Sequence, residues 1–136
     1  MDLRCRNTRE EDLVELVDWW KWHRFTPPVR EMLPDDLSSG IMVMDGNENI
    51  CAGFVYSTSA SALFHIEFIV STYKVRDKEL RKEALILLIG GLKYMAKEMG
   101  AKIIFTNLVN QNLKKSFLDN GFIVGSKNSE ELICLV

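Results

Sequence analysis

The sequence predicts a mixed α/β fold, because apolar runs typical of strands alternate with segments whose apolar residues recur at helical spacing. Two stretches carry most of this prediction. Residues 78–99 have a broad apolar stripe at helical spacing, and residues 110–122, NQNLKKSFLDNGF, place a short amphipathic helix directly before a glycine and an apolar run. With 136 residues, 47% of them hydrophobic, the chain is long enough for one core, so we expect a single domain over residues 1–136.

The first half of the chain is expected to hold a strand, a helix and a hairpin. Residues 2–7 are a candidate strand, and the Thr-x-x-Glu pattern at residues 8–11 is typical of a capping box that opens a helix. Apolar residues then recur at helical spacing as far as Arg24, where a Thr-Pro-Pro sequence follows. The apolar runs 41–44 and 50–57 are separated by the turn-forming sequence DGNEN, which predicts an antiparallel hairpin.

The second half predicts a central strand, two helices and three short strands. Residues 62–71, ALFHIEFIVS, are rich in aromatic and β-branched residues and predict the central strand. The long helix over residues 78–99 should end at Gly100, because glycine readily takes the positive φ that terminates helices. The three short strands are expected at residues 101–106, 122–124 and 131–136, with the helix of 110–120 between the first two.

Charge and composition exclude several classes of protein. The net charge of −2 and the pI of about 5.7 do not supply the positive field with which nonspecific nucleic-acid binders attract phosphate. No apolar run approaches the roughly 18 residues of a membrane span, and the charged N-terminus does not resemble a signal peptide, so we expect a cytoplasmic protein without membrane contact. The three cysteines are expected to be reduced, and the scattered histidines and cysteines predict no metal site.

Three motifs, taken in order, resemble those of the GCN5-related N-acetyltransferases, usually shortened to GNAT. Gly53 lies within the strand sequence ICAGF, Val70 ends the central strand before a basic segment, and Asn110 stands eleven residues ahead of Gly121-Phe122. The resemblance covers almost the whole chain. It implies a central mixed, mostly antiparallel sheet flanked by helices. It also implies transfer of acetyl from acetyl-coenzyme A to a primary amine by direct attack.

The resemblance implies a pyrophosphate-binding loop before the long helix, and the sequence departs from the family's pattern there. In the family, glycines let the backbone N–H groups at a helix start approach the phosphates. Arg76 fits the first position of the pattern, but Glu79 and Arg81 stand at both glycine positions. The helix start nevertheless carries a basic cluster, which a phosphate ligand or simple solvation would explain: Lys74, Arg76, Lys78, Arg81 and Lys82.

The central strand carries the candidate catalytic groups that the resemblance implies. The backbone of Ile69, Val70 and Ser71 would face acetyl-coenzyme A and contact the thioester carbonyl. Glu67 is the candidate general base, because apolar neighbours would raise its pKa by desolvation. His65 shares the same face of the strand by two-residue alternation and is the alternative base. Both side chains also have the simpler interpretation of facing solvent or pairing with a neighbour.

Three further residues are candidates through the resemblance. Many family members carry a tyrosine on the last helix near the coenzyme sulfur, and here that position is Phe117, which packs but donates no proton. Tyr73, in the loop after the central strand, is the remaining candidate acid. Asn110 is expected to bind the pantetheine arm of the coenzyme, with the competing interpretation of a helix N-cap.

The acceptor and the partners are open. Aromatic residues crowd between Trp19 and Phe25, and we interpret Trp20 as core and the others as cover for the sheet edge or as an acceptor wall. The acceptor is expected to be a small-molecule or protein amine, and a homodimer is possible. A second function stays open beside the enzyme: a noncatalytic binding or assembly module that keeps the fold but has lost efficient acetyl-coenzyme A use.

Overall fold

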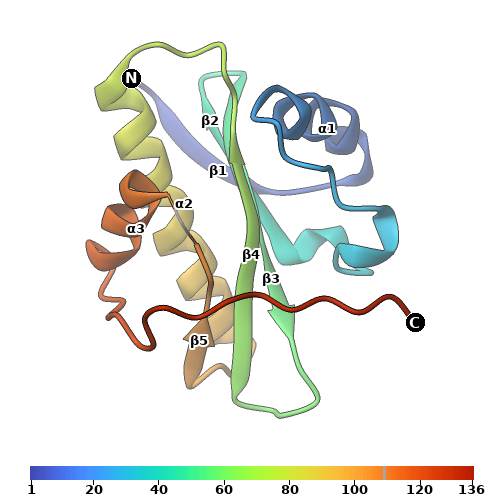
Figure 1. The fold of residues 1–136 in the computed structure, drawn as a ribbon. Coiled ribbons are helices and arrows are strands. Elements are labelled where there is room, and N and C mark those ends of the chain that lie inside the picture. The colour runs from blue at the N-terminus through green and yellow to red at the C-terminus, as the bar shows by residue number, and fades with distance from the viewer. Residues whose placement is uncertain (109) are drawn as a thin grey trace.

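A five-stranded sheet in the order β1-β2-β3-β4-β5 forms the centre of the molecule (Figure 1). The computed structural model describes residues 1–108 and 110–136. The strands are β1 (Leu3–Asn7), β2 (Gly40–Asp45), β3 (Glu48–Ser57), β4 (Leu63–Ser71) and β5 (Ile103–Phe105). The helices are α1 (Leu13–Trp22), α2 (Lys78–Glu98) and α3 (Gln111–Leu118), with short 3-10 turns at Glu10–Asp12, Arg30–Met32 and Leu37–Ser39.

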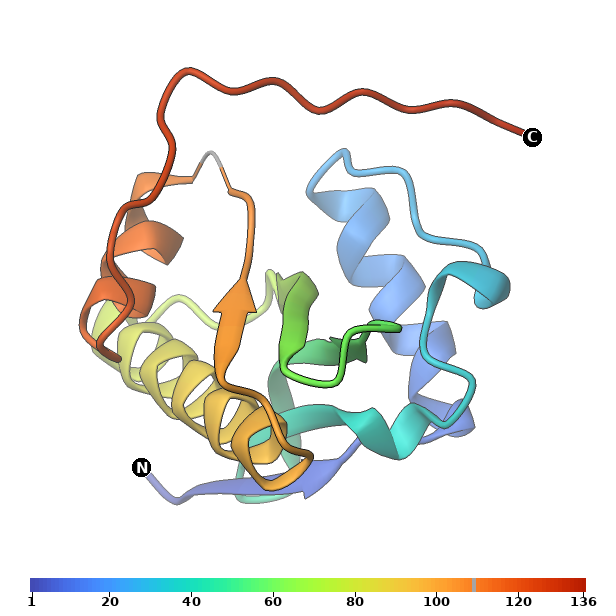
Figure 2. The same ribbon diagram turned by 90° about the horizontal axis from the view of Figure 1, so that it is seen from below.

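Neighbouring strands pair antiparallel from β1 to β4, and β4 pairs parallel with β5. This arrangement confirms the mixed, mostly antiparallel sheet flanked by helices. The helix α1 lies on one side of the sheet, and α2 with α3 lies on the other, as Figure 2 shows from below. The long α2 crossover is what allows β5 to run parallel to β4. Within the described residues, no helix is long and apolar enough to cross a membrane.

Two apolar cores lie on the two faces of the sheet, which explains why the inner strands are apolar at nearly every position. On β2, Val43 faces the core beneath α2, whereas its neighbour Met42 faces the core beneath α1. Both side chains are completely buried. The α1 core also contains Trp19 and Trp20, so Trp20 is a core residue as predicted and Trp19 is a second one.

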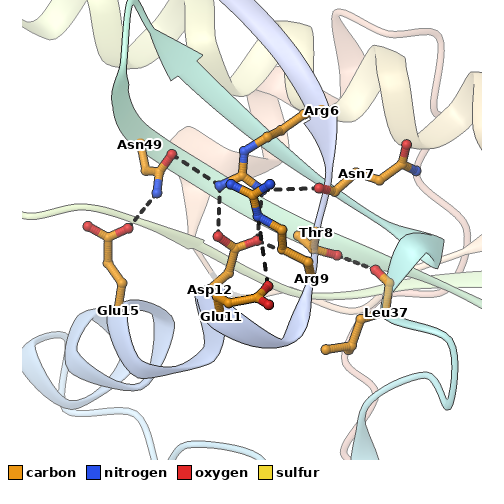
Figure 3. Close-up of polar contacts among 9 residues, drawn as sticks. All are labelled: Arg6, Asn7, Thr8, Arg9, Glu11, Asp12, Glu15, Leu37 and Asn49. Atoms are coloured by element: carbon orange, nitrogen blue, oxygen red, sulfur yellow. Dashed lines mark hydrogen bonds and ion pairs between the residues drawn. The ribbon is translucent and has the colours of Figure 1, made fainter.

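The start of α1 is held by an ion pair that the capping-box pattern only partly anticipated (Figure 3). The carboxylate of Asp12 accepts two hydrogen bonds from the guanidinium of Arg6, at 2.7 and 2.8 Å, and one from the N–H of Arg9 at 2.9 Å. The hydroxyl of Thr8 instead donates to the carbonyl of Leu37. The acidic residue that completes this cap is therefore Asp12, one position after the predicted Glu11.

The strands predicted at residues 122–124 and 131–136 are wrong. Neither segment belongs to a strand, and only Phe122 packs back on α3, against Phe117. Beyond it the chain continues as an irregular tail that leads from the α3 side of the molecule toward the α1 side (Figures 1 and 2). Leu132 and Leu135 are 90% and 93% exposed. An apolar run becomes a strand only when another strand supplies its hydrogen-bond partners, and local sequence does not specify that partner.

Candidate functional site

The candidate site lies where β4 and β5 separate. Their parallel pairing covers only three residue pairs and ends at His65 and Phe105. The hydroxyl of Thr106 makes the last connection, donating to the carbonyl of Ile66 at 2.8 Å. Strand β4 continues to Ser71, so within residues 1–108 and 110–136 its last residues have no strand partner on the β5 side. Residues 69–71, which the family resemblance assigned to acetyl-coenzyme A, lie in this part of β4.

A β-bulge reshapes β4 at the start of this open part. Ala52 pairs with Val70 and Phe54 pairs with Glu67, so β4 contains one residue more than β3 over the same interval. Phe68 takes a positive φ of 58°, which is unfavourable for a bulky residue. The extra residue resets the alternation of the strand: Phe68 packs on the α1 side, and Ile69 packs on the α2 side.

Gly53 provides the space opposite this bulge. A Cβ atom on Gly53 would lie 2.8 Å from Cγ1 of Ile69 and 2.9 Å from Cδ1 of Leu92. Both distances are shorter than side-chain carbons tolerate, so any larger residue would force the side chains of Ile69 and Leu92 to move. The glycine that contributed to the family resemblance therefore has a local structural reason in this chain.

Glu67 lies at the bulge with its side chain one-third exposed. Desolvation by its surroundings raises the pKa of the Glu67 carboxyl, and the negative charge of Glu131 raises it further. His65 lies on the same face, with its Nδ1 3.9 Å from Oε1 of Glu67. The two candidate bases thus lie close together where the pairing of β4 with β5 ends, on one face as the alternation of the strand predicted.

Aromatic rings surround the bulge on the α1 side of the sheet. The ring of Phe68 contacts Trp20 and Phe25 edge-on, each with centroids 6.4 Å apart, and Tyr56 at 6.2 Å. Phe25 is 51% exposed, whereas Trp20 is buried. The hydroxyl of Tyr56 donates to the carbonyl of Met32 at 2.8 Å. This aromatic surface adjoins Glu67 and is the candidate acceptor wall. Sequence reasoning did not identify Phe68 as a residue of the site, because a phenylalanine in a strand sequence gives no sign of a positive φ.

Tyr73 and His23 link the end of β4 to α1. The hydroxyl of Tyr73 hydrogen-bonds to Oδ2 of Asp18 at 3.0 Å, and this bond raises the pKa of the tyrosine, with smaller contributions from desolvation and from the charge of Asp18. Its ring stacks on Trp22 with centroids 4.9 Å apart. Nε2 of His23 hydrogen-bonds to the carbonyl of Ser71 at 2.9 Å. A tyrosine whose proton is held by a carboxylate is poorly placed to protonate a thiolate elsewhere.

The start of α2 is capped by a carboxylate. Oδ1 of Asp77 accepts hydrogen bonds from the N–H groups of Glu79 at 3.0 Å and Leu80 at 3.2 Å. These are two of the groups that the family resemblance assigned to a pyrophosphate. Arg76, Lys78 and Lys82 are exposed, and Arg81 is partly buried. In the described part of the chain, none of the five basic residues of this cluster makes an ion pair within 4.0 Å.

Asn110 and Phe117 have structural roles in α3. Oδ1 of Asn110 accepts hydrogen bonds from the N–H groups of Asn112 and Leu113, at 2.9 and 3.1 Å, so Asn110 is an N-cap. Phe117 is only 3% exposed, and its ring packs edge-on against Phe122 with centroids 4.9 Å apart. A coenzyme contact for either residue stays a prediction.

Comparisons with solved structures identify the fold. N-acetylglutamate synthase from Neisseria gonorrhoeae, solved with coenzyme A and N-acetyl-glutamate, superposes with a TM-score of 0.69 at 13% identity; the match covers 93% of this chain but only 29% of that enzyme. A Trypanosoma brucei acetyltransferase matches with a TM-score of 0.63 at 16% identity, covering 97% of this chain and 100% of the other. A GNAT family acetyltransferase from Staphylococcus aureus gives 0.60 at 16%, covering 98% and 100%.

The chain therefore has the fold of the GCN5-related N-acetyltransferases. No protein-family model and no curated protein sequence matches it. The likeness therefore rests on the arrangement of the backbone rather than on overall sequence similarity.

Proposed function

We propose that this protein transfers an acetyl group from acetyl-coenzyme A to a primary amine. The observation that carries this proposal is the open end of β4, where a bulge places Glu67 beside a stretch of backbone with which no described strand on the β5 side pairs. A pantetheine arm could lie between β4 and β5 and complete the hydrogen bonding of that backbone. The fold, shared with solved acetyltransferases, supports the same activity.

The proposed chemistry is a direct attack on the thioester. The amine nitrogen bonds to the carbonyl carbon, and a tetrahedral intermediate forms whose oxygen accepts a hydrogen bond from a backbone N–H within residues 69–71. Glu67 takes the proton that the amine loses, directly or through one water, and a raised carboxyl pKa suits this role. The C–S bond then breaks, and the thiolate leaves without a dedicated acid, which its low basicity permits.

His65 is the alternative base, since its imidazole lies on the same face of β4. The acceptor is proposed to approach over the aromatic surface of Tyr56, Phe25 and Phe68, which suits an amine attached to an apolar or aromatic group. Whether that amine belongs to a small molecule or to a protein stays open, and a cytoplasmic location and a homodimer stay predictions.

The second candidate function is a noncatalytic module with the same fold. A specific observation favours it: Asp77 occupies N–H groups at the start of α2 that would otherwise be available to phosphate. A module of this kind would keep the aromatic surface for a partner but would not turn over acetyl-coenzyme A.

Thermal unfolding with and without ligand separates the two candidates. A ligand that binds only the native state stabilises it by about 2.7 kcal/mol at a hundredfold excess over its Kd. We expect acetyl-coenzyme A to raise the unfolding midpoint and an amine acceptor to release free thiol from it. A midpoint that does not move with either acetyl-coenzyme A or coenzyme A would remove the support for the enzyme.

A further inference from the structure

We propose that Asp77 closes the N-terminus of α2 to phosphate, so that a coenzyme bound between β4 and β5 is held through its pantetheine arm and through basic side chains rather than through the backbone of this helix. The inference rests on the proposed function, because it concerns how the same site recognises its acyl donor. It makes Asp77 a specificity-determining residue that disfavours the pyrophosphate of the donor.

The geometry of the cap supports this assignment. The first N–H groups of a helix have no partner within the helix and carry partial positive charge, which is why phosphates bind there. In α2, Oδ1 of Asp77 accepts from the second and third of these groups, those of Glu79 and Leu80. The N–H of Arg81 is bonded to the carbonyl of Asp77 at 3.1 Å. A phosphate would therefore have to displace the side-chain carboxylate of Asp77 from these N–H groups.

A second acidic residue in the first turn reinforces this exclusion. Glu79 adds its negative charge at a position where the family resemblance calls for glycine. A phosphate that approached the helix axis would meet two carboxylates within one turn. Because both are solvent-exposed, each contributes only a modest repulsion, and the loss of the N–H contacts is the larger effect.

The basic cluster offers a different place for the anion. Lys78 and Lys82 are exposed on the first turns of α2, and Arg76 precedes the cap. Cations at a helix N-terminus oppose the helix dipole, so helix stability does not explain them. Their flexible side chains can meet phosphates outside the helix axis, where binding is weaker and depends on salt.

The test compares coenzyme A with D-pantetheine, which lacks the phosphates, on three single-residue variants followed by NMR titration. Asp77→Gly removes both the carboxylate and its hydrogen bonds, and glycine is itself well tolerated at an N-cap, so the helix is expected to stay folded. Asp77→Asn keeps a capping side chain and removes only the charge. Asp36→Gly is the matched control, because Asp36 caps the 3-10 turn Leu37–Ser39 in the same manner.

We expect Asp77→Gly to tighten coenzyme A binding by at least about fivefold and Asp77→Asn by less, while pantetheine affinity stays within about twofold for every variant. Asp36→Gly should change neither affinity. If the wild type and all variants bind both ligands and Asp77→Gly leaves coenzyme A affinity unchanged or weaker, the inference is overturned and the proposed function stands. If no variant binds either ligand, the proposed function fails and the inference fails with it.

Discussion

The catalytic role proposed for Glu67 depends on the shape of the backbone around it. A carboxylate on a regular strand of this sheet would be flanked by paired backbone on both sides. The bulge places Glu67 where β4 has left β5, partly desolvated and beside His65. Its raised pKa has a consequence for stability: the folded state holds a proton more strongly than the unfolded chain, so Glu67 lowers stability as pH rises from the ordinary Glu pKa through the raised one.

Glu67→Gln should lower the turnover of acetyl-coenzyme A by about 10²- to 10⁴-fold while coenzyme binding stays the same, because the base is lost and the backbone contacts are not.

The activity of the wild type should rise with pH through a value above the ordinary Glu pKa, since only the deprotonated carboxylate accepts a proton. Steady-state rates over a pH series check both. Glu48→Gln, in the β2–β3 hairpin, is the matched control. Unchanged turnover in Glu67→Gln together with a loss in His65→Gln would assign the base to His65.

Asp12→Asn should destabilise the protein by about 3 kcal/mol at neutral pH, because it leaves the partly buried Arg6 without its charge partner. Burial acts to raise the pKa of Asp12, but the hydrogen bonds from Arg6 and Arg9 outweigh it and hold the pKa below its usual range. The wild type should therefore lose this stabilisation as pH falls from the ordinary Asp pKa through the lowered one.

Urea unfolding of Asp12→Asn and wild type at neutral and acidic pH measures this difference, which should shrink in acid. Asp2→Asn is the control, since its pair with Arg4 is well exposed and should contribute less than about 1 kcal/mol. Equal costs for the two variants at neutral pH would contradict the assignment.

Among the elements, β4 depends most on its neighbours for its shape. The bulge at Phe68 needs the missing side chain of Gly53 on β3, and the open end needs β5 to be short. The first half of β4 therefore pairs with β5, whereas the second half, which does not, is the part proposed to contact a ligand.

Gly53→Ala should cost about 1 to 3 kcal/mol, because the added methyl group overlaps Ile69 and Leu92. Gly125→Ala is the matched control: a methyl group there would have nothing within 4 Å, and the backbone at that position requires no glycine. Thermal unfolding compares the two. A neutral Gly53→Ala would mean that the bulge yields easily, and coenzyme binding by that variant would then be expected to change instead.

At the scale of the whole molecule, the exposed tail sets a further expectation. Deleting residues 131–136 should leave the unfolding midpoint within about 2 °C of the full chain, because these side chains bury almost no surface. The deletion should also reduce self-association, since an exposed apolar segment invites it. Differential scanning calorimetry and light scattering check the two effects. A midpoint lowered by several degrees would show that the tail packs on the protein in solution.

Sequence reasoning predicted those elements whose signals all lie within one short segment of the chain. The helix over residues 78–99 was placed to within a residue of α2, because its apolar stripe and Gly100 mark it locally. The candidate bases Glu67 and His65 were placed on one face by simple alternation. An aspartate before a helix is a usual N-cap signal. The cap by Asp77 was missed because residues 76–81 were interpreted as a phosphate-binding loop.

What sequence reasoning could not reach depends on contacts between distant residues. The positive φ of Phe68 arises from the register between β3 and β4, and phenylalanine itself favours a regular strand. The strand assignments after Gly121 failed for the same reason, since their apolar runs indicate a strand but name no partner.

The order of the strands in the sheet repeats their order in the chain, and this has a consequence for folding. The β2–β3 and β3–β4 pairs close only the short connections of residues 46–47 and 58–62, whereas joining β5 requires the chain to bridge residues 72–102. Closing short loops costs less chain entropy, so the three-stranded meander is expected to form early and β5 to dock late. The contact between β4 and β5, which borders the proposed site, is thus expected to form after the meander, as is the contact of β1, which reaches β2 only across residues 8–39. The amide hydrogens of β1 and β5 should therefore exchange with solvent before those of the meander.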